Sequence, residues 1–145
     1  MRTRSTNTGD DYNLDDQIGF ILRKVSQRYT SIFTASFGND LTGPQWATLA
    51  KLYEIGPTSQ NQLGRLVALD AATIKGVVDR LSTRGFTSTS ADPADARRIV
   101  VALTDAGRKE AERGFPLAAA ITVEALAPLD TAQQVQLLTL LKKLS

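Results

Sequence analysis

The 145-residue sequence contains neither cysteine nor histidine. The absence of cysteine excludes disulfide bonds, thiolate nucleophiles and thiol-based redox sensing. The absence of histidine removes the commonest general base, and zinc sites that use neither residue type are rare. No pair of carboxylates lies in an apolar stretch that would shift its pKa. We therefore expect no enzyme activity, no cofactor and no metal site.

The sequence also lacks long apolar runs, and charged residues interrupt its longest predicted helices, so no membrane span is expected. Residues 1–13 are polar and aperiodic, and no apolar segment follows their basic residues as it would in a secretory signal. We expect a flexible arm there, one globular region over residues 14–145, and a location in the cytoplasm. The net charge of +2 and the pI of about 9.1 favour nucleic acid only weakly.

Three kinds of signal locate the helices: apolar residues at helical spacing, capping residues followed by Gln three positions later, and glycine or glycine–proline stops. In chain order they predict helices over about 14–37, 42–54 with the capping box Thr42–Gln45, 59–67 with the capping box Ser59–Gln62, 70–84 with Asp70 as N-cap, 104–126, and 130–144 with the capping box Asp130–Gln133. Between the fourth and fifth helices the period changes to that of strands. We expect strands at 86–90 and 98–103 around a turn at 92–95.

This order of elements predicts a mainly α fold with a small β-hairpin wing (α+β). A winged helix-turn-helix core over about 42–103 would bind DNA, which leaves the helices at 14–37 and 104–145 for dimerisation. The last helix is apolar around more than one stripe, which is more than a lone domain of this size needs. We expect a second copy to cover that face; the alternative is that it packs only within its own chain.

The helix at 70–84 has the pattern of a DNA-reading helix. Its apolar stripe is formed by Ile74, Val77, Val78 and Leu81. The open face and its flank then carry Ala72, Thr73, Lys75 and Arg80. Short side chains at the start of the helix allow it to enter a major groove about 12 Å wide, where Thr73 and Lys75 would meet base edges. The alternative is an ordinary solvated face.

The predicted hairpin tip carries Asp95 and Arg97. Two residues apart on an extended strand, they would point to the same side, so the carboxylate would orient the guanidinium. An oriented arginine on a thin ribbon suits a narrow minor groove. The alternative is a surface ion pair worth about 0–1 kcal/mol. Arg98 is expected to point to the opposite face of the strand.

The wing combines Asp92-Pro93, Asp95-x-Arg97 and Leu103-Thr104-x-x-Gly107, and the run LTGPQWATLAKLYEIGPTSQNQLGRLVALDAATIKGVVDRLSTRGF precedes it. From about Leu14 to the end, these features resemble the MarR (multiple antibiotic resistance regulator) family. The resemblance implies a homodimer, joined through its first, fifth and sixth helices, with one winged helix on each half of a near-palindromic operator. It implies DNA-reading roles on or beside the helix for Thr73, Lys75 and Arg80, minor-groove entry of Arg97 oriented by Asp95, and DNA-backbone contacts from Ser59, Gln60 and Asn61.

The wing departs from the family pattern at three positions. Members commonly carry basic residues near Thr89, Ser90 and Ala96, which are uncharged in this chain. We therefore expect fewer phosphate contacts from the wing and a milder salt dependence.

Many members of the family are repressors that small aromatic or phenolic acids release from DNA. In this chain Trp46 is expected at the junction of core and dimer helices, near Phe20 and Arg23. A planar apolar wall and one cation would suit an aromatic carboxylate. The alternative is that Trp46 is a core anchor and Arg23 is solvated. The expected function is a DNA-binding transcriptional regulator, a repressor released by an aromatic acid; the alternative is a winged-helix protein–protein interaction module without specific DNA binding.

Overall fold

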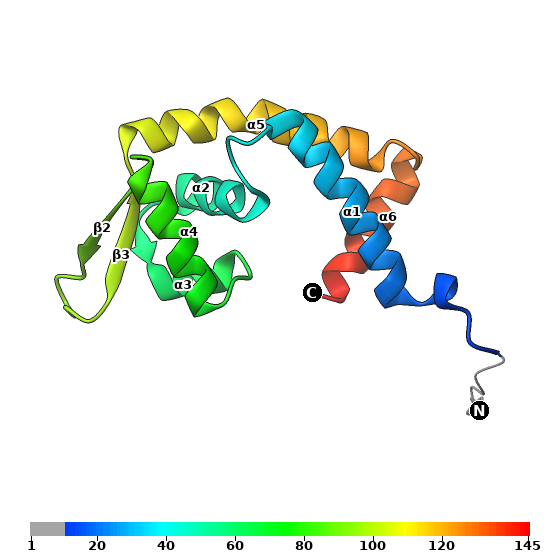
Figure 1. The fold of residues 1–145 in the computed structure, drawn as a ribbon, viewed down its shortest axis with the longest axis horizontal. Helices are drawn as coiled ribbons and strands as arrows, with labels where there is room; N and C mark the ends of the chain where they lie inside the picture. Colours follow the sequence, from blue (N-terminus) through cyan, green and yellow to red (C-terminus); the bar gives the residue numbers. More distant parts are fainter. Residues whose placement is uncertain (1–10) are drawn as a thin grey trace.

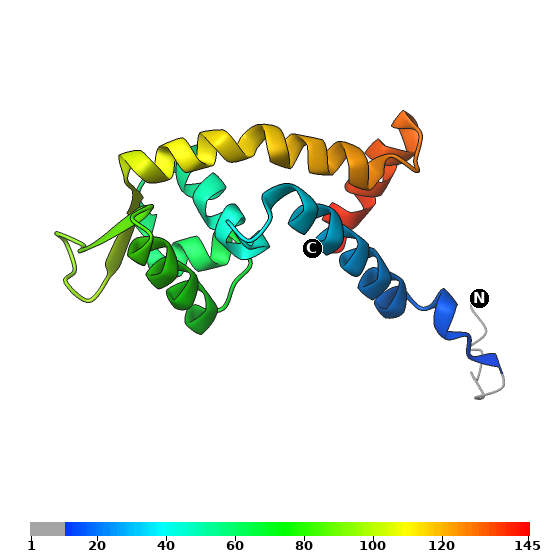
Figure 2. The ribbon, with the colours of Figure 1, turned by 45° about the horizontal axis from the view of Figure 1, so that its top comes forward.

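The computed structural model describes residues 11–145 and has the predicted architecture, mainly helical with a small wing (Figures 1 and 2). Residues 1–10, most of the predicted flexible arm, lie outside the described residues. After a short 3₁₀ turn, η2 (Leu14–Asp16), the elements are α1 (Ile18–Phe37), α2 (Gly43–Ile55), β1 (Thr58–Ser59), α3 (Gln60–Leu66), α4 (Ala71–Thr83), β2 (Thr87–Ala91), β3 (Ile99–Leu103), α5 (Asp105–Leu126) and α6 (Thr131–Lys143).

The first helix begins four residues later than predicted. Asn13 caps the 3₁₀ turn by accepting a hydrogen bond from the amide of Asp15 at 3.0 Å. Gln17 then has an extended backbone (φ −87°, ψ 134°), which separates the turn from α1. The apolar spacing continues across this break, and for that reason the break was not predicted.

The predicted capping boxes form at α2 and α6, but only half of the box at α3 is present. At α2, Thr42 Oγ1 accepts from the amide of Gln45 at 3.3 Å, and Gln45 Oε1 accepts from the amide of Thr42 at 3.2 Å. At α3, Ser59 Oγ accepts from the amide of Gln62 at 3.2 Å. The side chain of Gln62 instead accepts from Arg65 Nη2 at 2.7 Å.

The sheet has three antiparallel strands in the order β1-β3-β2. Strand β2 is shifted by one residue from its predicted bounds, and β3 begins one residue later than predicted because Arg98 belongs to the turn. The short strand β1 was not predicted: Thr58 pairs with Val101 of β3, and the chain enters α3 directly afterwards. This pairing ties the start of α3 to the base of the wing.

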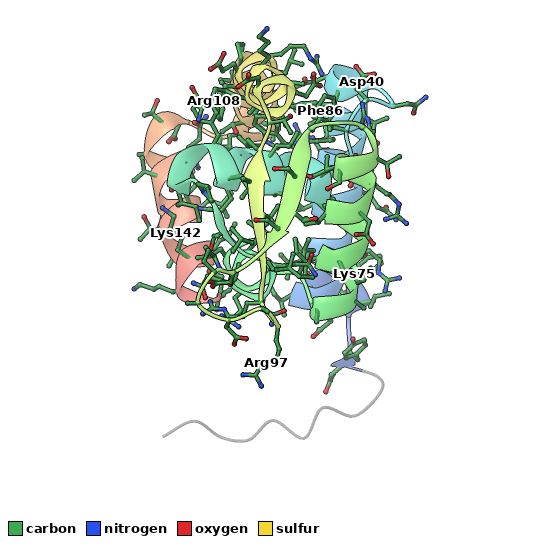
Figure 3. The ribbon with its side chains drawn as sticks, turned by 90° about the vertical axis from the view of Figure 1, so that its left-hand side faces the viewer. Asp40, Lys75, Phe86, Arg97, Arg108 and Lys142 are labelled. Atoms are coloured by element: carbon green, nitrogen blue, oxygen red, sulfur yellow. The ribbon has the colours of Figure 1, made fainter. Side chains whose placement is uncertain are left out.

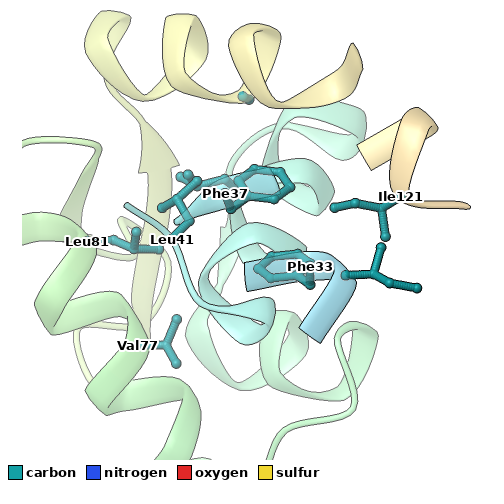
Figure 4. Packing of buried hydrophobic residues seen from close by; sticks show 9 residues of the cluster. Phe33, Phe37, Leu41, Val77, Leu81 and Ile121 are labelled. Carbon is teal, nitrogen blue, oxygen red and sulfur yellow. The ribbon is translucent and has the colours of Figure 1, made fainter. Parts of the chain in front are cut away.

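The core joins α1, α2, α4 and α5 (Figure 4). The four residues predicted to form the apolar stripe of α4 are all buried. Phe33 and Phe37 stack with ring centroids 4.5 Å apart, and Trp46 packs between Phe37 at 5.3 Å and Phe115 at 5.4 Å. Gly114 allows α5 to approach this cluster, because a Cβ atom there would overlap the Trp46 ring.

The helix α5 runs along one edge of the molecule, from the wing to the region where α1 and α6 lie (Figures 1 and 2). Apolar side chains are exposed at this far end, on the N-terminal half of α1 and around α6: Ile18, Ile21, Leu22, Val25, Val135, Leu137, Leu138, Leu140, Leu141 and Leu144. Within residues 11–145 no single helix is long and apolar enough to span a membrane; α5 and α6 reach that length and composition only jointly, and the chain bends by 104° between them.

Candidate nucleic-acid interface

The wing tip is a turn in which Asp95 holds Arg97. The carboxylate oxygen Oδ1 of Asp95 accepts from the amide of Arg97 at 3.0 Å and from its Nε at 3.2 Å. The carbonyl of Asp95 accepts from the amide of Arg98 at 3.0 Å and closes the turn. The predicted geometry, an extended strand, is therefore wrong, but an aspartate-centred turn brings the two side chains together just as closely.

The guanidinium of Arg97 is presented to solvent. Its side chain is 92% exposed and projects from the wing, away from the body of the molecule (Figure 3). Hydrogen bonds from the side chain and then from the amide of Arg97 lower the pKa of Asp95, because both favour the charged carboxylate. Asp95 thus remains a carboxylate at neutral pH, and Arg97 is oriented without being covered.

The first turn of α3 and the wing tip share one shallow cleft of about 70 Å³. It is lined by Ser59, Gln60, Asn61, Arg97, Arg98 and Ile99. Arg98 therefore lies on the same side as Arg97, and not on the opposite face as predicted, because it belongs to the turn. Its Nε lies 3.9 Å from Oδ2 of Asp92. Two arginines thus share this cleft with the polar start of α3.

The N-terminal part of α4 is exposed on the same side of the molecule. Ala72, Thr73 and Lys75 are all exposed, and Lys75 Nζ lies 2.7 Å from Oδ2 of Asp79. Asp70 caps the helix by accepting from the amide of Thr73 at 2.7 Å. The amide and then the hydroxyl of Thr73 lower the pKa of Asp70. Lys75 and Arg97 lie toward the side opposite to Asp40 and Arg108 (Figure 3).

Arg80 lies on the flank of α4, apart from the cleft at the wing. It lines a separate groove with Gln45, Thr83 and Arg84. Its guanidinium folds back beside Gly76, where a Cβ atom would lie 3.3 Å from Nη1. Arg80 is therefore beside the candidate reading surface, whereas Thr73 and Lys75 are on it.

The structure does not bring Phe20, Arg23 and Trp46 together within one chain. Phe20 and Arg23 precede Phe37 by 17 and 14 residues on α1, which is about 25 and 21 Å along a helix. Trp46, in contrast, contacts Phe37. Trp46 thus packs, partly buried, against the core, and Arg23 is exposed.

A different cleft, which sequence patterns did not indicate, lies between α1 and the connection to α2. It has a volume of about 450 Å³, and we call it the loop cleft. It is lined by Tyr29, Thr30, Phe33, Thr34, Gly38, Asn39, Leu41, Thr42, Gly43 and Pro44. Two aromatic rings, several hydroxyl groups and no charged side chain make up this lining. In the described part of the chain, no group of three or more Asp or Glu residues could hold a metal ion.

Comparison with known proteins places this arrangement among transcriptional regulators. Residues 41–99 match the model of the MarR family. The chain is 37% identical over 134 residues to the HTH-type transcriptional repressor NicR of Pseudomonas putida, covering 92% of this chain and 85% of that protein.

Two solved structures are similar over nearly the whole chain. A probable transcriptional regulator from Pseudomonas aeruginosa is 56% identical, with a TM-score of 0.89 and coverage of 92% of this chain and 100% of the other. BpsR of Bordetella bronchiseptica, whose DNA binding is regulated by 6-hydroxynicotinic acid, is 35% identical with a TM-score of 0.89 and coverage of 92% and 96%.

Proposed function

This chain belongs to the MarR family of DNA-binding transcriptional regulators, and on that premise we propose that it is a homodimeric repressor that acts in the cytoplasm. In this proposal the dimer binds a near-palindromic operator, and a small aromatic acid releases it from the DNA. The main support for a DNA-binding surface is the Asp95–Arg97 pair, which presents an oriented, exposed cation beside the first turn of α3. In this proposal Arg97 enters a minor groove and the start of α4 enters the adjacent major groove.

The polar residues of the shared cleft serve a second role in this proposal. Ser59, Gln60 and Asn61, at the start of α3, contact the DNA backbone, and Arg98 adds a cation at the same place. Ala72, Thr73 and Lys75 face the bases, and Arg80 contacts the flank of the groove. Phosphate contacts position the protein, while base contacts select the sequence.

Dimerisation is supported by the exposed apolar far end of the molecule. Val25, Leu137, Leu138 and Leu141 line a groove of about 450 Å³ between α1, the end of α5 and α6. A groove with such an apolar lining, continuous with the exposed leucines of α6, fits a second copy of the same surface.

The loop cleft is the proposed effector site. The rings of Tyr29 and Phe33 offer planar apolar contacts, and Thr30 and Thr34 offer hydroxyl groups to a hydroxylated ring. The regulation of BpsR by 6-hydroxynicotinic acid supports an aromatic acid as the class of ligand. Phe20 and Arg23, on the exposed half of α1, do not line this cleft in their own chain. In this proposal they take part from the other subunit.

Two linked measurements test the proposal. Selection from a random duplex pool should yield an inverted repeat that binds the protein; recovery of no preferred sequence would favour an interaction module and overturn the repressor assignment. The selected duplex is then titrated with 6-hydroxynicotinic acid and a panel of hydroxybenzoic acids, followed by fluorescence anisotropy. At least one acid should release the DNA and raise the melting temperature; a panel without effect on either would overturn the ligand class.

A further inference from the structure

The segment from Gly38 to Gly43 has two sides with different neighbours. One side forms the wall of the loop cleft through Asn39, Leu41 and Thr42. The other side faces α4, the proposed reading helix. Leu41 is 2% exposed and belongs to the same buried cluster as Val77 and Leu81, and it lies beside Leu81 in Figure 4. A ligand in the cleft and the reading helix therefore contact one short segment from opposite sides.

Asp40, at the centre of this segment, is bound to two other helices. Its backbone carbonyl accepts a hydrogen bond from Nη1 of Arg84. Its carboxylate lies 3.7 Å from Nη2 of Arg113 on α5. Arg84 is the C-cap residue of α4, and its guanidinium also lies over the ring of Phe86, 4.9 Å from the centroid. Arg84 thus connects the last turn of α4 to the wall of the cleft.

The segment has a defined point at which its backbone can turn. Gly38 has a φ of +62°, a conformation that other residues rarely adopt, and a Cβ atom there would meet nothing within 4 Å. On its other side, the segment ends at the capping box of α2. Asn39, Asp40 and Leu41 lie between these two ends of the segment.

We propose that Arg84 is the positioning residue that couples occupancy of the loop cleft to the reading helix. This proposal rests on the proposed function, because it takes the loop cleft as the effector site. An occupant pushes on Asn39 and Leu41 and shifts the carbonyl of Asp40. Through its hydrogen bond, Arg84 then moves the last turn of α4, and the orientation of the helix on DNA changes. Arg84 does not line the loop cleft; it acts through Asp40 and α4.

The absence of cysteine permits a test that requires no free effector. Thr34 is exposed and lines the cleft, so Thr34→Cys places the only thiol of the chain there. Reaction with 5,5′-dithiobis(2-nitrobenzoate) forms a mixed disulfide, releases one thionitrobenzoate, and leaves an aromatic carboxylate tethered in the cleft. A reducing agent removes it. Affinity for the selected duplex is measured before and after labelling in four backgrounds: both arginines retained, Arg84→Met, Arg84→Lys and Arg108→Met.

With Arg84 present, the label should weaken DNA binding by about tenfold. In the Arg84→Met background, which keeps an apolar side chain over Phe86, the loss should shrink to less than about threefold. Arg108→Met is the matched control, since Arg108 lies over Tyr53 at the same centroid distance of 4.9 Å but contacts α2; there the tenfold loss should persist. Arg84→Lys, which retains a donor, should restore part of the coupling.

Equal losses in the Arg84→Met and Arg108→Met backgrounds would overturn the proposal, and so would a label without effect in any background. Amide hydrogen exchange in the last turn of α4 gives the same comparison without DNA: the label should accelerate exchange with Arg84 present and not with Met in its place. Because the tether replaces the free ligand, failure of the acid panel would count against the proposed ligand class and leave this result intact.

Discussion

Asp95 binds both the amide and the Nε of Arg97, at 3.0 and 3.2 Å, so that one carboxylate fixes both ends of the arginine. Arg97→Ala should weaken operator binding and lower the log–log salt slope by about 1 for each wing engaged. Anisotropy titrations over a series of NaCl concentrations measure both quantities.

Asp95→Asn is the companion variant for this prediction. An amide oxygen still accepts from the backbone of Arg97, but the charge that orients the guanidinium is lost. The affinity should fall by less than in Arg97→Ala, and the salt slope should not decrease. If the salt slope of operator binding is unchanged in Arg97→Ala, Arg97 makes no groove or phosphate contact.

The start of α4 should control base preference. Thr73→Ala or Lys75→Met should change the ranking of operator variants, by about 1–3 kcal/mol where a direct base contact is lost. Competition between single-base variants of the selected duplex measures this. Arg80→Met provides the comparison on the flank and should weaken binding to all operator variants equally. If Thr73→Ala and Lys75→Met also weaken binding to all variants equally, these two residues contact the DNA backbone and not the bases.

The cap of α4 predicts a pH dependence of stability. The folded-state pKa of Asp70 lies below its ordinary value of 3.8, so the stabilisation from its charge is complete above that value and is lost as the pH falls through the folded pKa. Asp70→Asn keeps a capping oxygen and removes the charge. Its melting temperature should be below that of the unmodified chain at pH 7, and the difference should shrink as the pH falls below 3.8 and through the folded pKa of Asp70. A constant difference over this range would contradict the prediction.

The apolar groove should be required for dimerisation. Leu138 in the groove and Ile55 at the end of α2 are equally exposed, at 44% and 45%, so they form a matched pair. Leu138→Asp should weaken self-association by about tenfold or more in sedimentation equilibrium. Ile55→Asp should leave the dimer intact. Dissociation in both variants would indicate general unfolding, which a circular dichroism melt detects.

Gly114 should be sensitive to a single methyl group. Gly114→Ala forces the added carbon against the Trp46 ring and should lower the free energy of unfolding by about 1–3 kcal/mol. Urea denaturation measures the change. Trp46→Phe should offset part of the loss in the double variant. Gly19→Ala, where the methyl group meets nothing within 4 Å, should be neutral or stabilising.

Local rules predicted the helices well because their signals act over three or four residues. Thr42 with Gln45, and Asp70 with the amide of Thr73, satisfy helix ends that require a partner at that spacing. The buried stripe of α4 follows from helical periodicity in the same way. The 3₁₀ break at Gln17 was missed because the apolar spacing runs through it.

The missed features depend on residues far apart in the sequence. β1 is two residues long, and its strand character comes from pairing with Val101. Arg98 was assigned to the wrong face because the turn around Asp95 extends one residue further than the alternation of side chains indicates. The loop cleft combines α1 with the start of α2, and no periodicity within either segment marks it.

The length of α5 has a geometric consequence for the operator. Its 22 residues form a rod of about 33 Å, anchored at one end by Thr104, whose hydroxyl donates to the carbonyl of Gly85 at 2.5 Å. In the proposed dimer, two such helices meet at the far end, and each carries its own wing at the opposite end. Half-sites one turn of B-DNA apart are separated by about 34–36 Å. In the proposed dimer, the spacing of the half-sites therefore depends on the length of α5 as well as on the side chains that read bases.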